Sequence, residues 1–289
     1  MLRIPLYTAL ALIAFAANSV LCRLALSRGA IDPASFSAVR LIAGAAMLAI
    51  VVRARGSTRT PTASWTSAAM LFLYAVPFSF AYTSLSTGTG ALLLFGAVQT
   101  TMILAAVLRG DRTRPAQWLG LASAFGGLIY LVLPGVTAPS AQGATLMLLA
   151  GVAWGIYSLR GRAVADPLGQ TASNFAQAVP MILAVTLVAY RQLHMQLGGF
   201  LLALLSGALA SGIGYVLWYQ ALTGLSRVVA SIVQLAVPIL AAGSGVLFLG
   251  EHVTFRLWLA GLLVLGGITL VLVARPVGLS PSAMASEER

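Results

Sequence analysis

Long apolar stretches alternate along this chain with short polar connections. A bilayer hydrocarbon core is crossed by a helix of about 20 apolar residues, so each stretch predicts one membrane-spanning helix. The connections are short, as in residues 84–90 (Ser-Leu-Ser-Thr-Gly-Thr-Gly), which predicts antiparallel neighbours. The predicted spans are residues 5–26, 34–52, 66–83, 90–108, 116–133, 143–160, 171–190, 199–220, 226–248 and 254–274.

The composition excludes a soluble protein. Of the 289 residues, 60% are hydrophobic and 8% are charged, and the mean hydropathy is +0.96. Soluble domains carry roughly 25% charged residues, so the excess of apolar sequence must face lipid. We therefore predict an all-α integral membrane protein of ten transmembrane helices. Residues 276–289 are rich in Pro, Ser and Glu, and we expect a disordered cytoplasmic tail.

The positive charge is carried by arginines in the connections. A formal net charge of +11 in a soluble protein would suggest nucleic acid, but short cytoplasmic loops of membrane proteins also collect arginine. With a cytoplasmic N-terminus, twelve of the 17 arginines fall on the cytoplasmic side and three, Arg28, Arg191 and Arg256, on the other. We predict a multi-pass protein of the bacterial inner membrane with both termini in the cytoplasm and no nucleic acid partner.

The two halves of the chain resemble each other. A shift of 140 residues places Gly110-Asp111 on Gly250-Glu251, Trp118-Leu119 on Trp258-Leu259, and Gly126-Gly127 on Gly266-Gly267. Residues 1–137 and 138–275 then each hold five helices. Because five is odd, the second repeat must be inverted relative to the first. Inverted repeats are a recurring plan of secondary transporters, with the substrate site near the bilayer midplane.

These features resemble the drug/metabolite transporter superfamily, specifically its two-repeat EamA-type transporters, over essentially the whole chain before the tail. Ala153-Trp154-Gly155 fits the segment that opens a repeat, while Pro238 and Leu249-Gly250-Glu251 fit a repeat's fourth helix. The first half departs, because Arg109-Gly110-Asp111 replaces that motif and no proline lies near Gln99. The overall pattern is most similar to bacterial aromatic amino acid exporters.

Polar side chains inside the predicted spans are candidates for substrate contact, because a polar group in hydrocarbon normally faces the bundle interior or a wet cavity. Asn18, Gln99 and Gln234 could hydrogen-bond a substrate amine or carboxylate, and Arg40 could bind a carboxylate through two parallel bonds. Hydrogen bonding between helices is the alternative for each. Arg23, at the end of the first span, is expected to extend to the membrane interface.

Aromatic side chains recur at helical spacing in three of the predicted spans. An aromatic-lined cavity with a few polar groups would suit flat amphipathic solutes such as aromatic amino acids, although aromatic belts at the membrane interface are the alternative. The predicted substrate-binding residues are Asn18, Arg40, Phe78, Tyr82, Gln99, Trp154, Tyr157, Tyr215, Trp218 and Gln234.

The sequence gives little support for an enzymatic function. No predicted span carries an Asp or Glu well inside it, and without lysine there is no phosphate-binding loop. We expect no catalysis, cofactor or metal. The predicted function is a secondary transporter that exports neutral or aromatic amino acids and related metabolites by alternating access, as a monomer or weak homodimer in the bilayer. A lipid-processing or lipid-handling protein, or a carrier for another substrate class, is the alternative.

Overall fold

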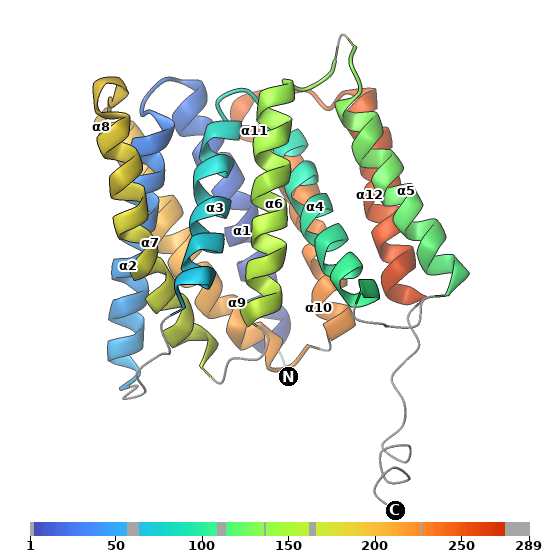
Figure 1. Cartoon of the computed structure of the whole chain (residues 1–289), viewed down its shortest axis with the longest axis horizontal. Helices are drawn as coiled ribbons and strands as arrows, with labels where there is room; N and C mark the ends of the chain where they lie inside the picture. Colours follow the sequence, from blue (N-terminus) through green and yellow to red (C-terminus); the bar gives the residue numbers. More distant parts are fainter. Residues whose placement is uncertain are drawn as a thin grey trace, which may run out of the picture.

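The computed structural model describes residues 3–56, 64–108, 114–135, 137–161, 166–225 and 227–274. Within these ranges the chain is a bundle of helices joined by short connections (Figure 1). The helices are α1 (Arg3–Ser27), α2 (Pro33–Ala54), α3 (Trp65–Ala81), α4 (Thr87–Leu108), α5 (Pro115–Val132), α6 (Ala141–Gly161), α7 (Pro167–Val188), η1 (Tyr190–Gln192), α8 (Leu197–Leu205), η2 (Ser206–Ile213), α9 (Gly214–Leu222), α10 (Arg227–Gln234), α11 (Ala236–Leu249) and α12 (Phe255–Val273).

The predicted all-helical, multi-span membrane fold is confirmed. In the described part of the chain, nine helical segments are long and apolar enough to cross a membrane, and α3 is a shorter apolar helix. The predicted spans coincide with these helices to within a few residues. The seventh starts earlier than expected, at Pro167, because Asp166 accepts a hydrogen bond from the Gly169 backbone N–H (3.0 Å) and proline suits a helix's first turn. The predicted tail lies outside the described residues.

Two predicted spans are not the continuous α-helices that the hydropathy pattern suggested. The ninth is divided at Leu235 into α10 and α11. Pro238 explains the division, because its ring displaces the carbonyl of residue 234 and it has no N–H to donate to that carbonyl. The eighth contains η2, a π-helical segment between α8 and α9. Such segments shift the register of a helix and often lie at functional sites.

The helices of one half pack largely against those of the other. α2 lies against α7, α4 against α11, and α5 against α12 at one edge of the bundle (Figure 1). α3 packs on α6, and the segment α8–α9 packs on α1. α5 and α12 approach closely because glycines face each other, and a Cβ on Gly120 would clash with the Gly267 carbonyl.

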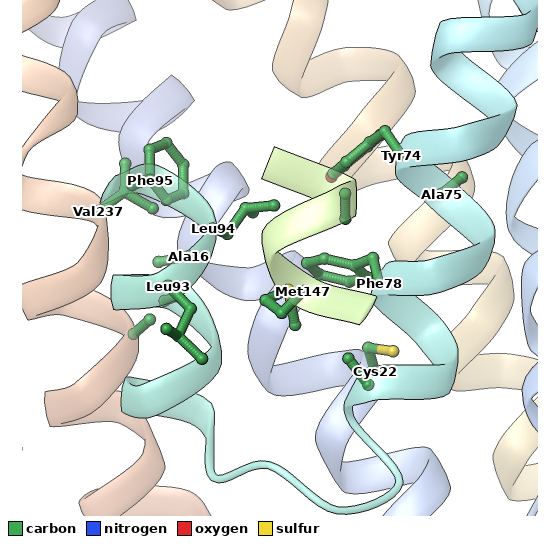
Figure 2. Packing of buried hydrophobic residues seen from close by; sticks show 14 of the residues in the cluster. Ala16, Cys22, Tyr74, Ala75, Phe78, Leu93, Leu94, Phe95, Met147 and Val237 are labelled. Atoms are coloured by element: carbon green, nitrogen blue, oxygen red, sulfur yellow. The ribbon is translucent and has the colours of Figure 1, made fainter. Parts of the chain in front are cut away.

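Apolar side chains fill the centre of the bundle where α3, α4, α6 and α11 meet. Figure 2 shows Phe78 of α3 near Met147 of α6, and Phe95 of α4 near Val237 of α11. Each of these side chains is buried. This packing holds α3, α4 and α6 together beside the cavity described next.

Candidate functional site

A cavity of about 760 Å³ lies among helices α1, α3, α4, α6, α7, α9 and α10. Its volume falls within the range of small-molecule sites in proteins. Seven of the ten residues predicted from the sequence line it: Asn18, Phe78, Trp154, Tyr157, Tyr215, Trp218 and Gln234. The three that do not are Arg40, Tyr82 and Gln99.

One wall of the cavity is aromatic and is centred on Trp154 of α6. The Trp154 ring stacks on Tyr157, with ring centroids 5.2 Å apart, and on Tyr215 of α9 at 5.4 Å. Tyr74 of α3 lies against its remaining side at 4.7 Å. Phe15 of α1, which sequence reasoning missed, packs against Tyr215 at 5.9 Å and also lines the cavity. Its position three residues before Asn18, on the same helical face, could have indicated it.

A second wall is polar and comes mainly from α7. Thr171 and Tyr219 share a hydrogen bond of 2.7 Å between their hydroxyl oxygens. The side-chain amide of Asn174 donates to the Tyr157 hydroxyl (3.2 Å), and the side-chain amide of Gln170 donates to the Asn174 side-chain oxygen (3.0 Å). These side chains present hydroxyl and amide groups to the cavity beside the aromatic wall, which they adjoin at Tyr157. Such a site can hold a solute that is apolar at one end and polar at the other.

Asn18 connects the cavity to the π-helical segment. Its side-chain oxygen accepts hydrogen bonds from the hydroxyls of Ser206 (2.8 Å) and Ser211 (3.4 Å). Arg40 Nε in turn donates to the Ser211 hydroxyl oxygen at 3.4 Å, and its Nη2 donates to the Tyr74 hydroxyl at 2.7 Å. A hydrogen-bonded chain therefore runs from one cavity-lining residue, Asn18, through η2 and Arg40 to another, Tyr74.

Arg40, Tyr82 and Gln99 are buried between helices rather than exposed to the cavity. The Tyr82 hydroxyl donates to the Thr87 carbonyl oxygen at 3.3 Å. Gln99 is 2% exposed, and within the described residues its Nε2 has no hydrogen-bond partner. Polarity alone could not distinguish a residue buried between helices from a residue of the cavity wall, because both kinds of position are shielded from lipid. Substrate contact by these three residues stays a prediction.

The cavity reaches the surface at one end of the bundle. Arg160 and Gly161, at the end of α6, line the cavity and are both exposed. Arg160 Nε donates to the Ser67 hydroxyl oxygen at 3.2 Å. Ser64 before α3 and Ala230 of α10 line the same end. We call the end of the bundle that carries these residues the mouth end. It lies at the bottom of Figure 1, where the chain begins.

Polar contacts join the helices at the opposite end. Glu251 forms an ion pair with Arg23 (3.4 Å) and accepts the Thr87 backbone N–H at 2.8 and 3.0 Å. Arg23 Nη1 also donates to the carbonyl oxygens of Tyr82 (2.9 Å) and Thr83 (3.3 Å). These acceptors hold the Arg23 guanidinium between α1, α3 and α11, and its extension to the membrane interface stays a prediction. We call this the tied end.

A second contact at the tied end joins the α1–α2 connection to the α7–α8 connection. The Asp32 backbone N–H donates to the His194 carbonyl (3.0 Å), and the His194 backbone N–H donates to the Asp32 carboxylate (2.9 Å). Burial by itself raises the pKa of Asp32. Hydrogen bonds from Ser35, and from the backbone N–H groups of His194 and Ala34, outweigh burial and lower this pKa below its ordinary value.

Comparisons with known proteins agree with this architecture. A family model described as the EamA-like transporter family matches residues 141–273. A protein of Pseudomonas aeruginosa, itself described as uncharacterized, is 52% identical over 274 residues, which cover 94% of this chain and 96% of that protein. The chain belongs to the EamA-like transporter family. Membership of this transporter family, together with the long apolar helices, supports a multi-pass membrane protein that transports small molecules.

Two more distant matches also extend over nearly the whole chain. An uncharacterized transporter of Archaeoglobus fulgidus is 23% identical over 279 residues, covering 92% of this chain and 96% of that protein. A solved crystal structure is similar with a TM-score of 0.64 at 21% identity, covering 93% of this chain and 99% of that one. The likeness to this structure supports the fold alone.

Proposed function

We propose that this EamA-family transporter exports neutral amino acids, aromatic ones above all, and related small metabolites through the cavity by alternating access. The observation that carries the proposal is the composition of the cavity walls. The stacked rings of Trp154, Tyr157 and Tyr215 offer an apolar surface for a flat side chain. Thr171 and Asn174 offer hydroxyl and amide groups for a polar end.

The packing of the helices supports two inverted repeats, residues 1–137 and 138–275. If the repeats are related by a two-fold axis in the membrane plane, the equivalent helices α2 and α7, and likewise α5 and α12, should meet at that axis. Both pairs are in contact. The packing of α3 on α6 likewise corresponds to that of α8–α9 on α1. Such a scaffold can rock between two packings without ATP.

The arginine distribution supports a mouth end that faces the cytoplasm. Arg53 in the last turn of α2, Arg55 directly after α2 and Arg160 in the last turn of α6 all lie at this end. All three side chains are exposed. Because arginine accumulates in cytoplasmic connections, we infer that both termini are cytoplasmic and that the cavity accepts solute from the cytoplasm.

The absence of acidic residues inside the described spans supports transport without obligatory proton coupling. Asp32 and Asp166 precede helices and Glu251 follows one, whereas proton relays in transporters usually use buried carboxylates or histidines. A neutral amino acid is a zwitterion, so its passage moves no net charge. We therefore propose export driven by the amino acid gradient itself.

Counterflow in proteoliposomes tests the proposal. Vesicles are loaded with an unlabelled neutral amino acid, and a trace of the labelled form is added outside with the pH gradient and the potential collapsed. We expect transient accumulation of label above equilibrium for aromatic amino acids. No accumulation for any neutral amino acid would remove amino acids as the substrate class. Accumulation only with a proton gradient would contradict the proposed energetics.

A further inference from the structure

Arg40 is a buried cation without an acidic partner in the described part of the chain. It lies in α2 and is 2% exposed. The described acidic residues are used elsewhere: Asp32 accepts from Ser35 and His194, Asp166 caps α7, and Glu251 pairs with Arg23. Because arginine does not deprotonate in proteins, the bundle holds a permanent positive charge that no described carboxylate balances.

The groups that do contact Arg40 are neutral. Its Nη2 donates to the Tyr74 hydroxyl (2.7 Å) and its Nε to the Ser211 hydroxyl (3.4 Å). The guanidinium carbon lies 5.2 Å from the Tyr74 ring centroid and 4.8 Å from that of Phe78. Its Nη1 is buried and has no hydrogen-bond partner among the described residues. A buried donor and charge left uncompensated are destabilising, and an ionisable residue inside a membrane bundle is by default a sign of function.

Arg40 lies close enough to the cavity for its charge to act on a bound solute. Tyr74 and Phe78, which cover the guanidinium, are themselves cavity-lining residues. Arg40 therefore lies directly behind the cavity wall, separated from it by these two side chains. No Asp or Glu is among the described residues that line the cavity, and the other charged group there is Arg160 at the mouth. A cavity lined by one sign of charge within low-dielectric walls attracts ions of the opposite sign and repels those of the same sign.

We infer that Arg40 is a charge filter that makes the cavity accept solutes with a carboxylate and reject organic cations. The inference rests on the proposed function and specifies the ionic form of its substrate. A zwitterionic or anionic solute would place its carboxylate toward Tyr74 and Phe78, and its ring against Trp154. Movement of the two covering side chains would let the carboxylate reach the unpartnered Nη1. A unit charge roughly 8 Å from Arg40, in a medium of effective permittivity about 20, would change binding by about 30-fold.

Three solutes with one indole ring and different charges test the inference in the wild-type protein. Tryptophan is zwitterionic, indole-3-propionate is anionic and tryptamine is cationic at neutral pH. Each unlabelled solute competes against counterflow of labelled tryptophan in proteoliposomes. We expect tryptophan and indole-3-propionate to compete at least about tenfold better than tryptamine. Equal competition by tryptamine, with tryptophan exchange intact, would overturn the charge filter alone. No tryptophan exchange at all would overturn the proposed function, and the inference with it.

Variants at Arg40 identify the source of the preference. Arg40→Gln should bring the ratio of tryptamine to indole-3-propionate inhibition constants close to one, whereas Arg40→Lys keeps the charge and should keep the preference. Arg53→Gln removes an exposed arginine from the same helix and should leave the ratio at its wild-type value. The ratio is measured within each variant, so reduced protein yield does not affect it. An unchanged ratio in Arg40→Gln would mean that Arg40 only packs α2 against its neighbours. If Arg40→Gln does not fold, the ratio in Arg40→Lys decides, and its loss would contradict the filter.

Discussion

The mouth end and the tied end of the bundle use the same helices but different contacts. At the mouth end, Met102 of α4 and Ala230 of α10 both line the cavity, so the helices that carry them stand apart. At the tied end, Glu251 after α11 binds the first backbone N–H of α4 and also Arg23 of α1. One group of helices, α3, α4 and α6, is thus separated from the group α1, α9 and α11 at one end and joined to it at the other.

The chemistry of the tied end suggests how such an asymmetry can reverse. Apart from the packing of α4 on α11, its contacts between the two groups are polar and involve helix ends and connections. Individual contacts of this kind contribute only about 1–3 kcal/mol. Two packings that differ by a few contacts of this size can interconvert thermally. The comparison therefore predicts that the tied end opens when the mouth end closes.

The largest expected effect is one-sided access to the cavity. Ser158 lines the cavity, and Ser158→Cys should react with a membrane-impermeant thiol reagent from the mouth side and much more slowly from the other side. The native Cys22 is fully buried, so the wild-type protein serves as the unlabelled control. Labelling in inside-out and right-side-out vesicles makes the measurement. Equal labelling from both sides would contradict a closed tied end, and labelling mainly from the periplasm would reverse our orientation.

A smaller effect is expected from loss of the central contact at the tied end. Glu251→Ala removes the acceptor for the Thr87 N–H and the partner of Arg23, which should lower the free energy of unfolding by about 2 kcal/mol. It should also favour the state with the tied end open, and so slow the labelling of Ser158→Cys. Thermal unfolding in detergent measures the stability of the variant. His252→Ala is the control, because His252 is the exposed neighbour of Glu251. Equal unfolding temperatures for the two variants would mean that the Glu251 contacts do not hold the tied end.

The smallest expected effect comes from Asp32. Asp32→Asn keeps one side-chain acceptor oxygen for two backbone donors, Ser35 N–H and His194 N–H, and should destabilise by about 1 kcal/mol at neutral pH. Because the folded-state pKa of Asp32 is lowered, its stabilisation is present above the unfolded-state pKa and is lost as pH falls through the folded-state pKa. The difference between wild type and variant should therefore shrink below about pH 4. A constant difference down to pH 2 would contradict this origin.

The sequence predicted the spans and much of the cavity for a simple physical reason. Lipid imposes a run of apolar residues on each helix, and the aromatic pairs Trp154–Tyr157 and Tyr215–Trp218 recur at the spacing of one helical face. Both pairs line the cavity. Within a span, an aromatic or polar face that avoids lipid must turn to the bundle interior. That rule narrowed the choice of residues without any knowledge of the packing.

The same rule could not separate a cavity wall from a contact between helices. Gln99 and Tyr82 do turn away from lipid, but they are buried against neighbouring helices and do not line the cavity. The ion pair of Arg23 with Glu251 joins residues 228 positions apart, and no local pattern connects them. The π-helical segment η2 lies in close contact with α2, where a Cβ on Gly207 would clash with the Arg40 carbonyl. These features follow from tertiary packing, which a single sequence does not specify locally.

The most direct test of whether the solute passes through the cavity is counterflow of labelled tryptophan. It compares two variants, each of which lacks one tryptophan side chain. Trp154 stacks on two cavity tyrosines, whereas Trp258 lies on α12 and is 55% exposed on the face toward lipid. Loss of the Trp154 ring should weaken binding by about 1–3 kcal/mol, or roughly 5- to 150-fold. We predict that Trp154→Ala loses exchange at low tryptophan concentration while Trp258→Ala exchanges like wild type at equal abundance in the membrane. Equal exchange by the two variants would contradict a solute path through this cavity.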